Sequence, residues 1–276
     1  MKVVTHTDAL AEAFGENEAV KMLSGIGFDA LDYSMFVGYP KEDEDYKERA
    51  YTLKKTADSC NITFEQAHAP FPGMLDENGR LSEKRIDMIV RAIEFAGILD
   101  AKYIVVHPLT LKENQKEVNF EYYNMLLPHC QKSNIKIVLE NMWGWHDGNA
   151  GPAACSEGAE FAEYVDMLDK NWFAACLDIG HSSMKNTGST VFEMINALGG
   201  RLECLHVHDN DLKDDLHMFP YLGSVDWNAV MSALKKSGYT GNLTFECDGF
   251  LRRYPKELYL PVLKMLLAVG RQLVKI

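Results

Sequence analysis

The sequence IKIVLEN, from Ile135 to Asn141, is the stretch that decides the fold. Its nearly continuous apolar run is typical of a strand with both faces buried, since a half-exposed strand would alternate apolar and polar residues. The run closes at a carboxylic acid, Glu140. Strands buried on both faces are characteristic of parallel sheets that are covered by helices. The stretch therefore predicts a parallel strand that ends in a chemically active side chain.

The same arrangement recurs along the chain. Short apolar runs are closed by an acid or a histidine at His107, Glu140, Asp178, His206 and Glu246, and a further predicted strand ends at His68. Each of these residues follows the previous one after about 30 to 40 positions, which suits repeated strand–helix units. Together with the length of the chain, this pattern predicts an α/β fold, the (β/α)8 TIM barrel, in which the carboxyl ends of all strands meet on one face.

We place eight strand–helix units in a single domain over residues 1–276. The predicted strands are residues 2–5, 30–35, 62–68, 103–107, 135–141, 173–179, 202–208 and 242–247. The predicted helices are residues 16–24, 44–59, 82–99, 120–133, 157–169, 191–198, 226–236 and 256 onward. Pro70 and Pro72 prevent further strand pairing after the third strand. Residues 142–156 are predicted to be a long loop, a feature that is usually functional in a compact domain.

An open, doubly wound sheet is the weaker alternative. Such a sheet would show the same alternation of strands and helices, but it usually carries a glycine-rich phosphate loop after its first strand. No such loop follows residues 2–5. The closed barrel is therefore the favoured fold.

The composition excludes several classes of protein. The chain has a formal charge of −12, which weighs against a nucleic-acid partner, because phosphate backbones are bound by clustered Lys and Arg. Residues 1–8 show no signal-peptide pattern, and the apolar run 258–269 is interrupted by Pro261 and Lys264, so we expect neither secretion nor a membrane. The six scattered cysteines predict free thiols in a reducing cytoplasm.

Four strand-end residues form a candidate metal site: Glu140, Asp178, His206 and Glu246. They close four neighbouring strands of the predicted barrel, so their side chains can point to a common centre. Three carboxylates and one imidazole suit Mn²⁺, Mg²⁺ or Co²⁺. Buried carboxylates are costly unless they are paired or bind a metal. The sequence therefore predicts a divalent metal site, although any one of these residues alone could be a helix cap or a solvated loop group.

Short motifs around these residues extend over most of the chain. They are Ala67-His68-Ala69-Pro70, Val106-His107-Pro108, Leu139-Glu140-Asn141, Leu177-Asp178-Ile179-Gly180-His181, His206-Val207-His208-Asp209-Asn210, and His217 followed by Gly223 and Val225-Asp226-Trp227. Their order and spacing resemble the xylose isomerase-like TIM barrel superfamily. That superfamily includes sugar phosphate isomerases and epimerases, inosose dehydratases and endonuclease IV.

The resemblance to the sugar epimerases implies one divalent metal, Mn²⁺ before Mg²⁺, Co²⁺ or Zn²⁺, held by Glu140, Asp178, His206 and Glu246. Glu140 and Glu246 would also be the catalytic acid and base. A metal that chelates a carbonyl and the adjacent hydroxyl acidifies the C–H between them and stabilises the enediolate. The expected function is a metal-dependent sugar isomerase or epimerase that moves a proton next to a sugar carbonyl.

Four further residues are expected to bind substrate: His181, His68, His107 and Trp143. The resemblance implies that His181 contacts substrate oxygens beside the metal. His68 and His107 would hydrogen-bond sugar hydroxyls or an approaching carboxylate, and Trp143 would stack on a sugar face or pack within its loop.

Some polar and aromatic residues near these motifs have an open role. His208 shares the inward parity of His206 and is either a hydrogen-bonding residue behind the metal or a packed neighbour. Trp145 is open in the same way as Trp143. Arg252 and Arg253 are interpreted as exposed, although they could clamp a phosphate or carboxylate.

Endonuclease IV is the main functional alternative. Its three-zinc site matches nine residues here, with His217 and Asp215 as the additional metal ligands, and would activate water for attack on a phosphodiester. The start Val4-Thr5-His6-Thr7 differs from the Gly-Ala-His of that nuclease, and the acidic charge also weighs against DNA. We therefore expect a small-molecule sugar as partner, with no nucleic acid and no membrane, and the sequence is compatible with a homo-oligomer.

Other sugar chemistry stays open. An inosose dehydratase or keto-sugar lyase would use the same metal site, and a non-catalytic sugar-binding barrel is a third class. The ketose epimerases carry an Arg after the metal-binding His, where this chain has only Lys213. The particular sugar is therefore not fixed by the resemblance.

Overall fold

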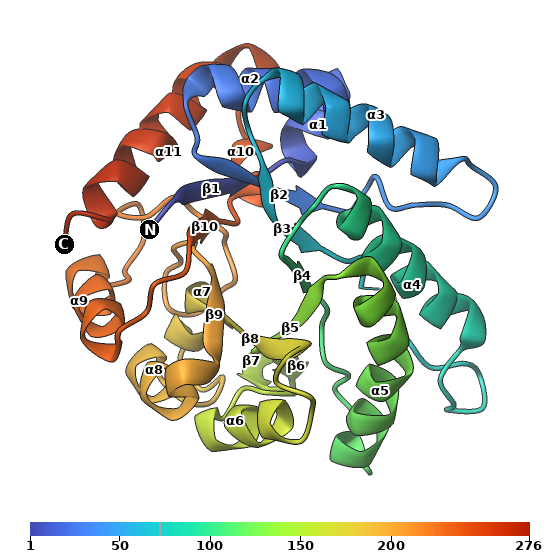
Figure 1. The fold of residues 1–276 in the computed structure, drawn as a ribbon. Coiled ribbons are helices and arrows are strands. Elements are labelled where there is room, and N and C mark those ends of the chain that lie inside the picture. Colours follow the sequence, from blue (N-terminus) through green and yellow to red (C-terminus); the bar gives the residue numbers. More distant parts are fainter. Residues whose placement is uncertain (72) are drawn as a thin grey trace.

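Eight parallel strands close into a barrel (Figure 1). The computed structural model of the chain describes residues 1–71 and 73–276, so Pro72, predicted to help end the third strand, lies outside the described residues. The barrel strands in spatial order are β10 (Leu243–Phe245), β1 (Val3–His6), β2 (Ala30–Ser34), β3 (Phe64–His68), β4 (Tyr103–Val105), β5 (Lys136–Glu140), β8 (Phe173–Asp178) and β9 (Leu202–His206).

The last two strands complete the ring. The Val207 N–H donates to the Thr244 carbonyl at 2.9 Å, and the Glu246 N–H donates to the Val207 carbonyl at 3.2 Å. These two bonds join the chain just after β9 to β10 and its continuation. The predicted (β/α)8 TIM barrel is therefore confirmed.

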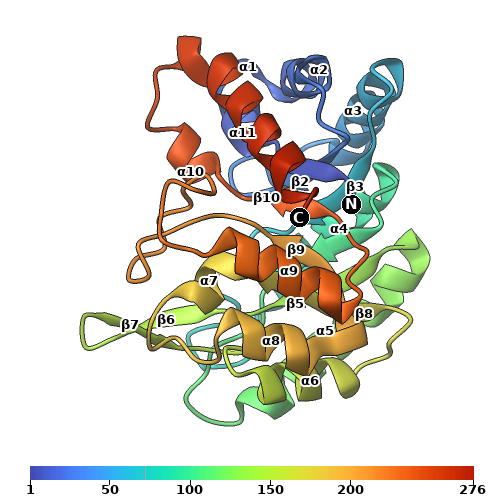
Figure 2. The same cartoon turned by 90° about the vertical axis from the view of Figure 1, so that its left-hand side faces the viewer.

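Helices surround the barrel on its outer side (Figures 1 and 2). They are α1 (Asp8–Phe14), α2 (Glu16–Ile26), α3 (Tyr46–Ser59), α4 (Glu83–Ile98), α5 (Gln115–Ser133), α6 (Gly158–Asp166), α7 (Ile179–Ser183), α8 (Val191–Leu198), α9 (Trp227–Ser237), α10 (Asp248–Leu251) and α11 (Tyr259–Leu273), with short 3₁₀ turns at Gly199–Arg201 and Lys256–Leu258. In Figure 2 the two chain termini lie near one end of the barrel, and the loops after the strands extend from the other.

The structure adds elements to the sequence prediction, among them the short helices α7 and α10. The helix predicted at 120–133 begins earlier, at Gln115, and α1 was not predicted. The region predicted as a loop, 142–156, contains an antiparallel hairpin of β6 (Trp143–His146) and β7 (Asn149–Pro152). Its turn residues Asp147 and Gly148 have φ of 51° and 82°, the left-handed conformation that Asp-Gly adopts readily in two-residue hairpins.

The barrel interior below the strand ends is filled by small residues. Val105, Val138, Ala174, Cys176 and Cys204 form a buried cluster there. Because strand side chains alternate with period two, Val138, Cys176 and Cys204 share the inward parity of the functional residues two positions later. This layer closes the barrel beneath the site.

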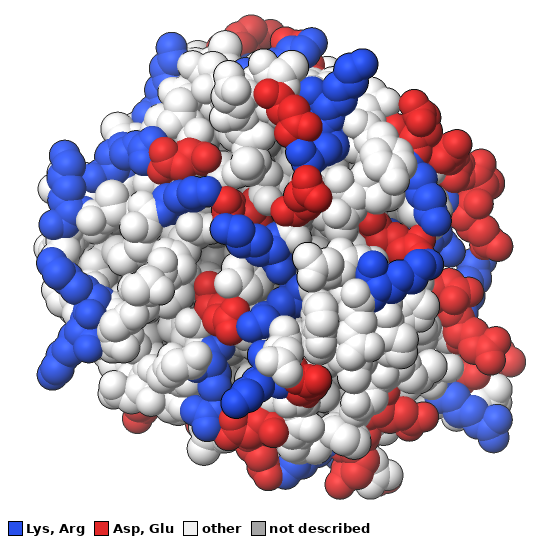
Figure 3. Space-filling view, in the orientation of Figure 1, with Lys and Arg blue, Asp and Glu red and all other residues white. Residues whose placement is uncertain are grey.

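The opposite end of the barrel carries charges of both signs. Figure 3 views the amino ends of the strands, where Lys and Arg side chains alternate with Asp and Glu. Lys136 pairs with Glu203 at 2.7 Å, and Lys102 pairs with Glu65 at 2.7 Å. All six cysteines are free. No helix in residues 1–71 or 73–276 combines the length and apolarity needed to cross a bilayer.

Candidate functional site

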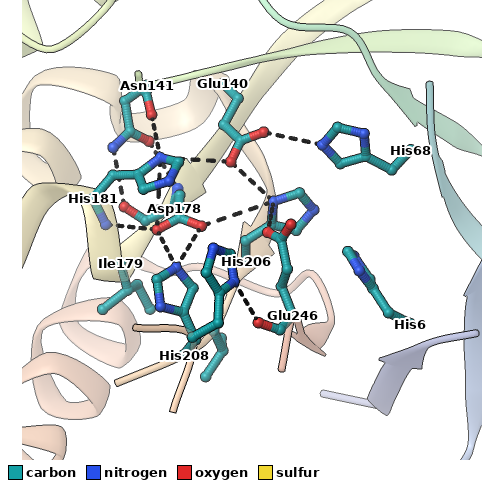
Figure 4. A network of polar contacts seen from close by, with 12 residues as sticks. His6, His68, Glu140, Asn141, Asp178, Ile179, His181, His206, His208 and Glu246 are labelled. Carbon is teal, nitrogen blue, oxygen red and sulfur yellow. Dashed lines mark hydrogen bonds and ion pairs between the residues drawn. The ribbon is translucent and has the colours of Figure 1, made fainter. Parts of the chain in front are cut away.

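The carboxyl ends of four strands bring the predicted metal quartet together (Figure 4). The Nδ1 atom of His206 lies 2.8 Å from Glu246 Oε2, 3.0 Å from Glu140 Oε1 and 3.9 Å from Asp178 Oδ2. All four side chains are buried, with at most 8% of Glu246 exposed. Residues from β5, β8, β9 and the end of β10 thus meet around one nitrogen atom.

Electrostatics keep the two glutamates ionised. Burial disfavours their charged forms, but the His206 imidazolium beside them lowers the pKa of both Glu140 and Glu246 well below the usual range. Burial also opposes a charge on His206, yet Glu246 and Glu140 outweigh it and raise the His206 pKa. A positive charge at the position of His206 Nδ1 is therefore what these carboxylates favour.

Three histidines direct the same ring nitrogen, Nε2, toward a carboxylate of the site. Nδ1 of His68 lies 2.8 Å from the Ala69 carbonyl, Nδ1 of His181 lies 2.8 Å from the Asn141 carbonyl, and Nδ1 of His217 lies 2.9 Å from the Glu246 carbonyl. A carbonyl only accepts, so each Nδ1 carries the hydrogen and donates it. In the neutral ring Nε2 is then left with its lone pair, and the backbone carbonyl at Nδ1 fixes the orientation of the ring as a metal ligand would require.

A second group of donor atoms lies beside the quartet. His181, His208, Asp215 and His217 each offer an atom within 4.8 Å of the others. Asp215 Oδ2 lies 3.4 Å from His181 Nε2 and 3.1 Å from His217 Nε2. Burial opposes charge on His217, but Asp215 raises its pKa to about 10. The residues predicted as additional metal ligands, His217 and Asp215, thus share one cluster with His181.

His208 connects this second group to the quartet. Its Nε2 lies 3.1 Å from Asp178 Oδ1 and 3.6 Å from Asp215 Oδ1, and its ring stacks on His217 with centroids 4.1 Å apart. Gly180 lies against the ring, because a Cβ atom on Gly180 would collide with His208. His208 therefore contacts residues of the candidate site directly rather than filling space alone.

A third group forms on the other side of Glu140. The Nε2 atoms of His107 and His68 lie 3.1 Å and 3.4 Å from Glu140 Oε2. Burial lowers the pKa of His68, which keeps its ring neutral. Within residues 1–71 and 73–276, Glu140 Oε2 nevertheless has no hydrogen bond of good geometry. This buried oxygen is an unsatisfied acceptor.

The donor atoms of the quartet fit a divalent cation. Each residue offers an atom within 4.8 Å of the others. Ligand atoms about 2.0 to 2.2 Å from a small divalent ion are at most about 4.4 Å apart, so only a small contraction is needed. A cation would also satisfy Glu140 and replace the proton on His206 Nδ1 as the central positive charge. The chemistry and the geometry of these side chains are thus compatible with a metal.

The quartet opens into a cavity of about 360 Å³. Phe36, Phe71 and Trp143 supply aromatic walls. The Trp143 Nε1–H donates to Asp215 Oδ2 at 3.2 Å, whereas Trp145 is 64% exposed and does not line the cavity. The predicted substrate contacts His181, His107 and Trp143 all border this space, while His68 lies behind His107, within 3.1 Å of it.

Arg252 is exposed, as the sequence indicated, but it also lines the cavity. Its guanidinium donates to Asp8 at 2.7 Å and to Glu12 at 2.8 Å. Arg253 instead lies over the Phe250 ring at 5.5 Å. The positive charge of Arg252 is therefore already balanced by two carboxylates.

His6 and Asp32 are among the buried residues at the site that were not predicted. His6 Nε2 lies 3.4 Å from Asp32 Oδ2, and neither side chain makes a hydrogen bond of good geometry within the described part of the chain. His6 also shares a donor group with His206 and Glu246. His6 ends β1, just as the predicted site residues end their strands, so its position in the sequence could have predicted its place at the site. Asp32 lies inside β2 and gave none.

The Asp209 carboxylate holds the loop that follows β9, which explains why Asp209, Gly223 and Trp227 occur together in the sequence motif there. Its fully buried carboxylate accepts four hydrogen bonds, from the N–H groups of Asn210, Tyr221 and Val225 and from Trp227 Nε1. Gly223 passes so close that a Cβ atom there would collide with Asp209. The loop that carries Asp215 and His217 is thus tied to one carboxylate.

The sequence matches a known family and two relatives. Residues 20–266 match the model of the xylose isomerase-like TIM barrel family. An uncharacterized protein of Methanocaldococcus jannaschii is 29% identical over 188 residues, which cover 65% of this chain and 62% of that protein. An uncharacterized protein of Sinorhizobium fredii is 24% identical over 207 residues, covering 69% and 64%. The matches therefore span less than two thirds of the length of either relative.

Solved structures share the fold over nearly the whole chain. A D-tagatose 3-epimerase-like protein has a TM-score of 0.74 at 22% identity, covering 99% of this chain and 100% of that one. A D-psicose 3-epimerase has a TM-score of 0.76 at 16% identity, covering 99% of both chains. The 3-keto-D-glucoside 4-epimerase of E. coli has a TM-score of 0.73 at 16% identity, again covering 99% of both. Since the family model spans most of the sequence, the chain belongs to the xylose isomerase-like TIM barrel family.

Proposed function

We propose that the chain is a divalent-metal-dependent sugar isomerase or epimerase that moves a proton on the carbon next to a sugar carbonyl. The observation that carries this proposal is the meeting of Glu140 and Glu246, both with a lowered pKa, at His206 Nδ1. Two ionised carboxylates at one cavity can act as a base and, once protonated, as an acid. The sugar epimerases among the structural neighbours support the same chemistry.

Glu140, Asp178, His206 and Glu246 would hold the cation. Mn²⁺ is the first choice, because three of the four ligands are carboxylates. When bound, the cation would polarise the carbonyl and an adjacent hydroxyl and so acidify the C–H between them.

The protein side chains would carry the proton. Glu246 accepts it from the substrate carbon, and the C–H electron pair moves into the carbonyl to give an enediolate. Glu140, once it has taken up a proton from solvent, delivers it to a carbon of the enediolate, which restores the carbonyl, and Glu246 releases the substrate proton to solvent. His181, with its Nε2 directed into the cavity, and Trp143, on the wall, would orient the sugar, while Phe36 and Phe71 limit access of water.

The cavity favours an uncharged sugar. Arg252 is the sole Lys or Arg that lines it among the residues the structure describes, and Asp8 and Glu12 already bind that guanidinium. A phosphate or carboxylate group on the substrate would face Glu140, Asp215 and Glu246 without a free cation. Neutral keto sugars are therefore the proposed substrate class.

Exchange of substrate hydrogen with solvent deuterium tests the proposal. The Mn²⁺-loaded protein is expected to wash deuterium into at least one member of a panel of ketoses, inososes and keto-glucosides. Glu246→Gln and Glu140→Gln should lower that exchange at least about 100-fold. Glu203→Gln, a matched change at the amino end of β9, should leave it unchanged. Exchange that persists in Glu246→Gln would remove Glu246 as the base, and a panel with no exchange at all would refute the proposed function.

A zinc phosphodiesterase is the second candidate, and the three adjoining donor groups favour it. The quartet lies between the other two groups. His68 and His107 share Glu140 with it, and the group of His181, Asp215 and His217 adjoins it at Asp178. Three such groups could hold up to three metal ions, with His217 and Asp215 as ligands of an additional ion. Metal analysis separates the candidates: about one ion per chain supports the sugar enzyme, and three zinc ions support the phosphodiesterase.

Dehydration or lyase chemistry on a keto sugar would begin with the same proton removal. Product analysis by NMR distinguishes it, because elimination releases water or an aglycone while epimerisation conserves the composition of the substrate.

A further inference from the structure

A second cavity adjoins the site, and its lining is mostly apolar. It measures about 400 Å³ and lies between the segment after β3 and the segment after β4. Met74, Leu75, Leu109 and Leu111 supply side chains to it, and no Asp, Glu, Lys or Arg lines it within residues 1–71 and 73–276. We call this cavity the leucine groove. Its occupant must be apolar and uncharged, because a charge placed there would lose its hydration without gaining a partner.

The leucine groove is built on fixed walls. The fully buried Asn119 side chain accepts from the Leu109 N–H at 2.7 Å and donates to the Leu109 carbonyl at 2.8 Å. Gln115 Oε1 accepts from the Leu111 N–H at 2.9 Å. Arg85 donates to the carbonyls of Gly73 and Leu75 on the other wall. Side chains of α5 and α4 thus hold both walls in place, so little ordering is required when a ligand binds.

The groove adjoins the catalytic cavity. Phe71 and His107 line both spaces, and their rings stack with centroids 5.0 Å apart. His107 Nε2 lies 3.1 Å from Glu140, whereas Phe71 is 56% exposed. A ligand anchored at Glu140 can therefore extend past this ring pair into the groove.

We propose that the substrate is a keto-sugar glycoside whose uncharged aromatic or aliphatic aglycone occupies the leucine groove. The sugar ring lies at Glu140 and Glu246, and the aglycone contacts Leu109 and Leu111. This inference rests on the proposed function for the identity of the sugar. The apolar binding site itself rests on the geometry of the groove.

Direct binding measures the groove separately from turnover. Phenyl β-D-glucoside and methyl β-D-glucoside, neither of which carries a ketone, are titrated into the protein by calorimetry or saturation-transfer NMR. The phenyl compound is expected to bind at least about tenfold more tightly, because burying a phenyl ring removes a large apolar area from water. Equal affinities would overturn the inference.

Two variants of Leu111 change the groove in opposite ways. Leu111→Asp introduces a charge and Leu111→Trp fills the space, and both should bring the phenyl affinity close to the methyl affinity. Leu260→Asp, an exposed leucine on α11, should leave the ratio unchanged. A phenyl preference that survives both Leu111 variants would place the aglycone elsewhere and refute the inference.

Deuterium exchange with phenyl and methyl 3-keto-glucosides completes the test. A higher kcat/KM for the phenyl compound supports the inference, and its loss in both Leu111 variants supports it further. If free ketoses exchange while the phenyl group gives no advantage in binding or exchange, the proposed function is supported and the aglycone site is refuted. If the protein prefers the phenyl compound in binding but exchanges no keto sugar, both the keto-glycoside assignment and the proposed function are refuted.

Discussion

Replacing Asp209 with Asn should destabilise the protein strongly, although the two side chains are nearly the same size. The carboxylate accepts two hydrogen bonds on each oxygen: Asn210 and Val225 donate to Oδ1, and Tyr221 and Trp227 donate to Oδ2. An amide group must turn its NH₂ toward one of these pairs of donors. Two bonds to a charged acceptor, each worth about 1.5 to 3 kcal/mol, are then lost, so we expect a cost of about 4 kcal/mol.

Thermal and urea unfolding of the metal-free protein measure this cost. A loss of about 4 kcal/mol corresponds to a fall in Tm of roughly 10 °C for a chain of this size. The matched control is Asp226→Asn in the same segment, where Asp226 caps α9 by accepting from the Ala229 N–H at 3.0 Å. Asn caps helices about as well as Asp, so this control should be nearly neutral. A Tm for Asp209→Asn no lower than that of the control would refute the reasoning.

Two further predictions concern the metal and the acid stability. Gln66 lies 2.9 Å from His206 Nε2, the ring nitrogen on the far side from Glu140 and Glu246. Gln66→Leu should weaken Mn²⁺ binding about tenfold, because it removes a group that orients this ligand. An unchanged Kd in an Mn²⁺ titration would contradict that role. Burial opposes ionisation of Glu94, but Tyr46, Lys132 and Lys47 lower its pKa from 4.5 to about 2. This carboxylate therefore stabilises the fold above about pH 4.5 and loses that contribution as pH falls toward 2. Since both lysines are largely exposed, Glu94→Gln should lower the free energy of unfolding at pH 7 by only about 1 kcal/mol. The urea midpoint of the variant should also fall less steeply than that of the parent protein as the pH is lowered from 4.5 toward 2. Parallel falls in the two proteins would contradict the assignment.

Local patterns were sufficient to predict the barrel and the residues at its strand ends. A buried strand is a continuous apolar run, and the polar residue that closes it stands out in the sequence, as Glu140 and Asp178 do. The parallel pairing of these strands then brings their ends together without any further information. For this reason the quartet could be predicted before its geometry was known.

Other features depend on contacts that the sequence does not show. Asp32 lies between two apolar residues of β2, and its role follows only from the approach of His6 on the neighbouring strand. The pairing of Arg252 with Asp8 joins residues 244 positions apart. The hairpin turn at Asp147-Gly148 is the exception, because that dipeptide is a local hairpin signal that the length of the predicted loop obscured.

The close approach of Gly180 to His208 makes these two positions a size-matched pair across α7 and the end of β9. In a relative that carries alanine or serine in place of Gly180, the imidazole would be displaced from Asp178, so a smaller side chain should accompany that change at the position of His208. The glycine can therefore serve as a sequence marker within the family: where it is absent, the link between Asp178 and Asp215 through this ring should be absent as well.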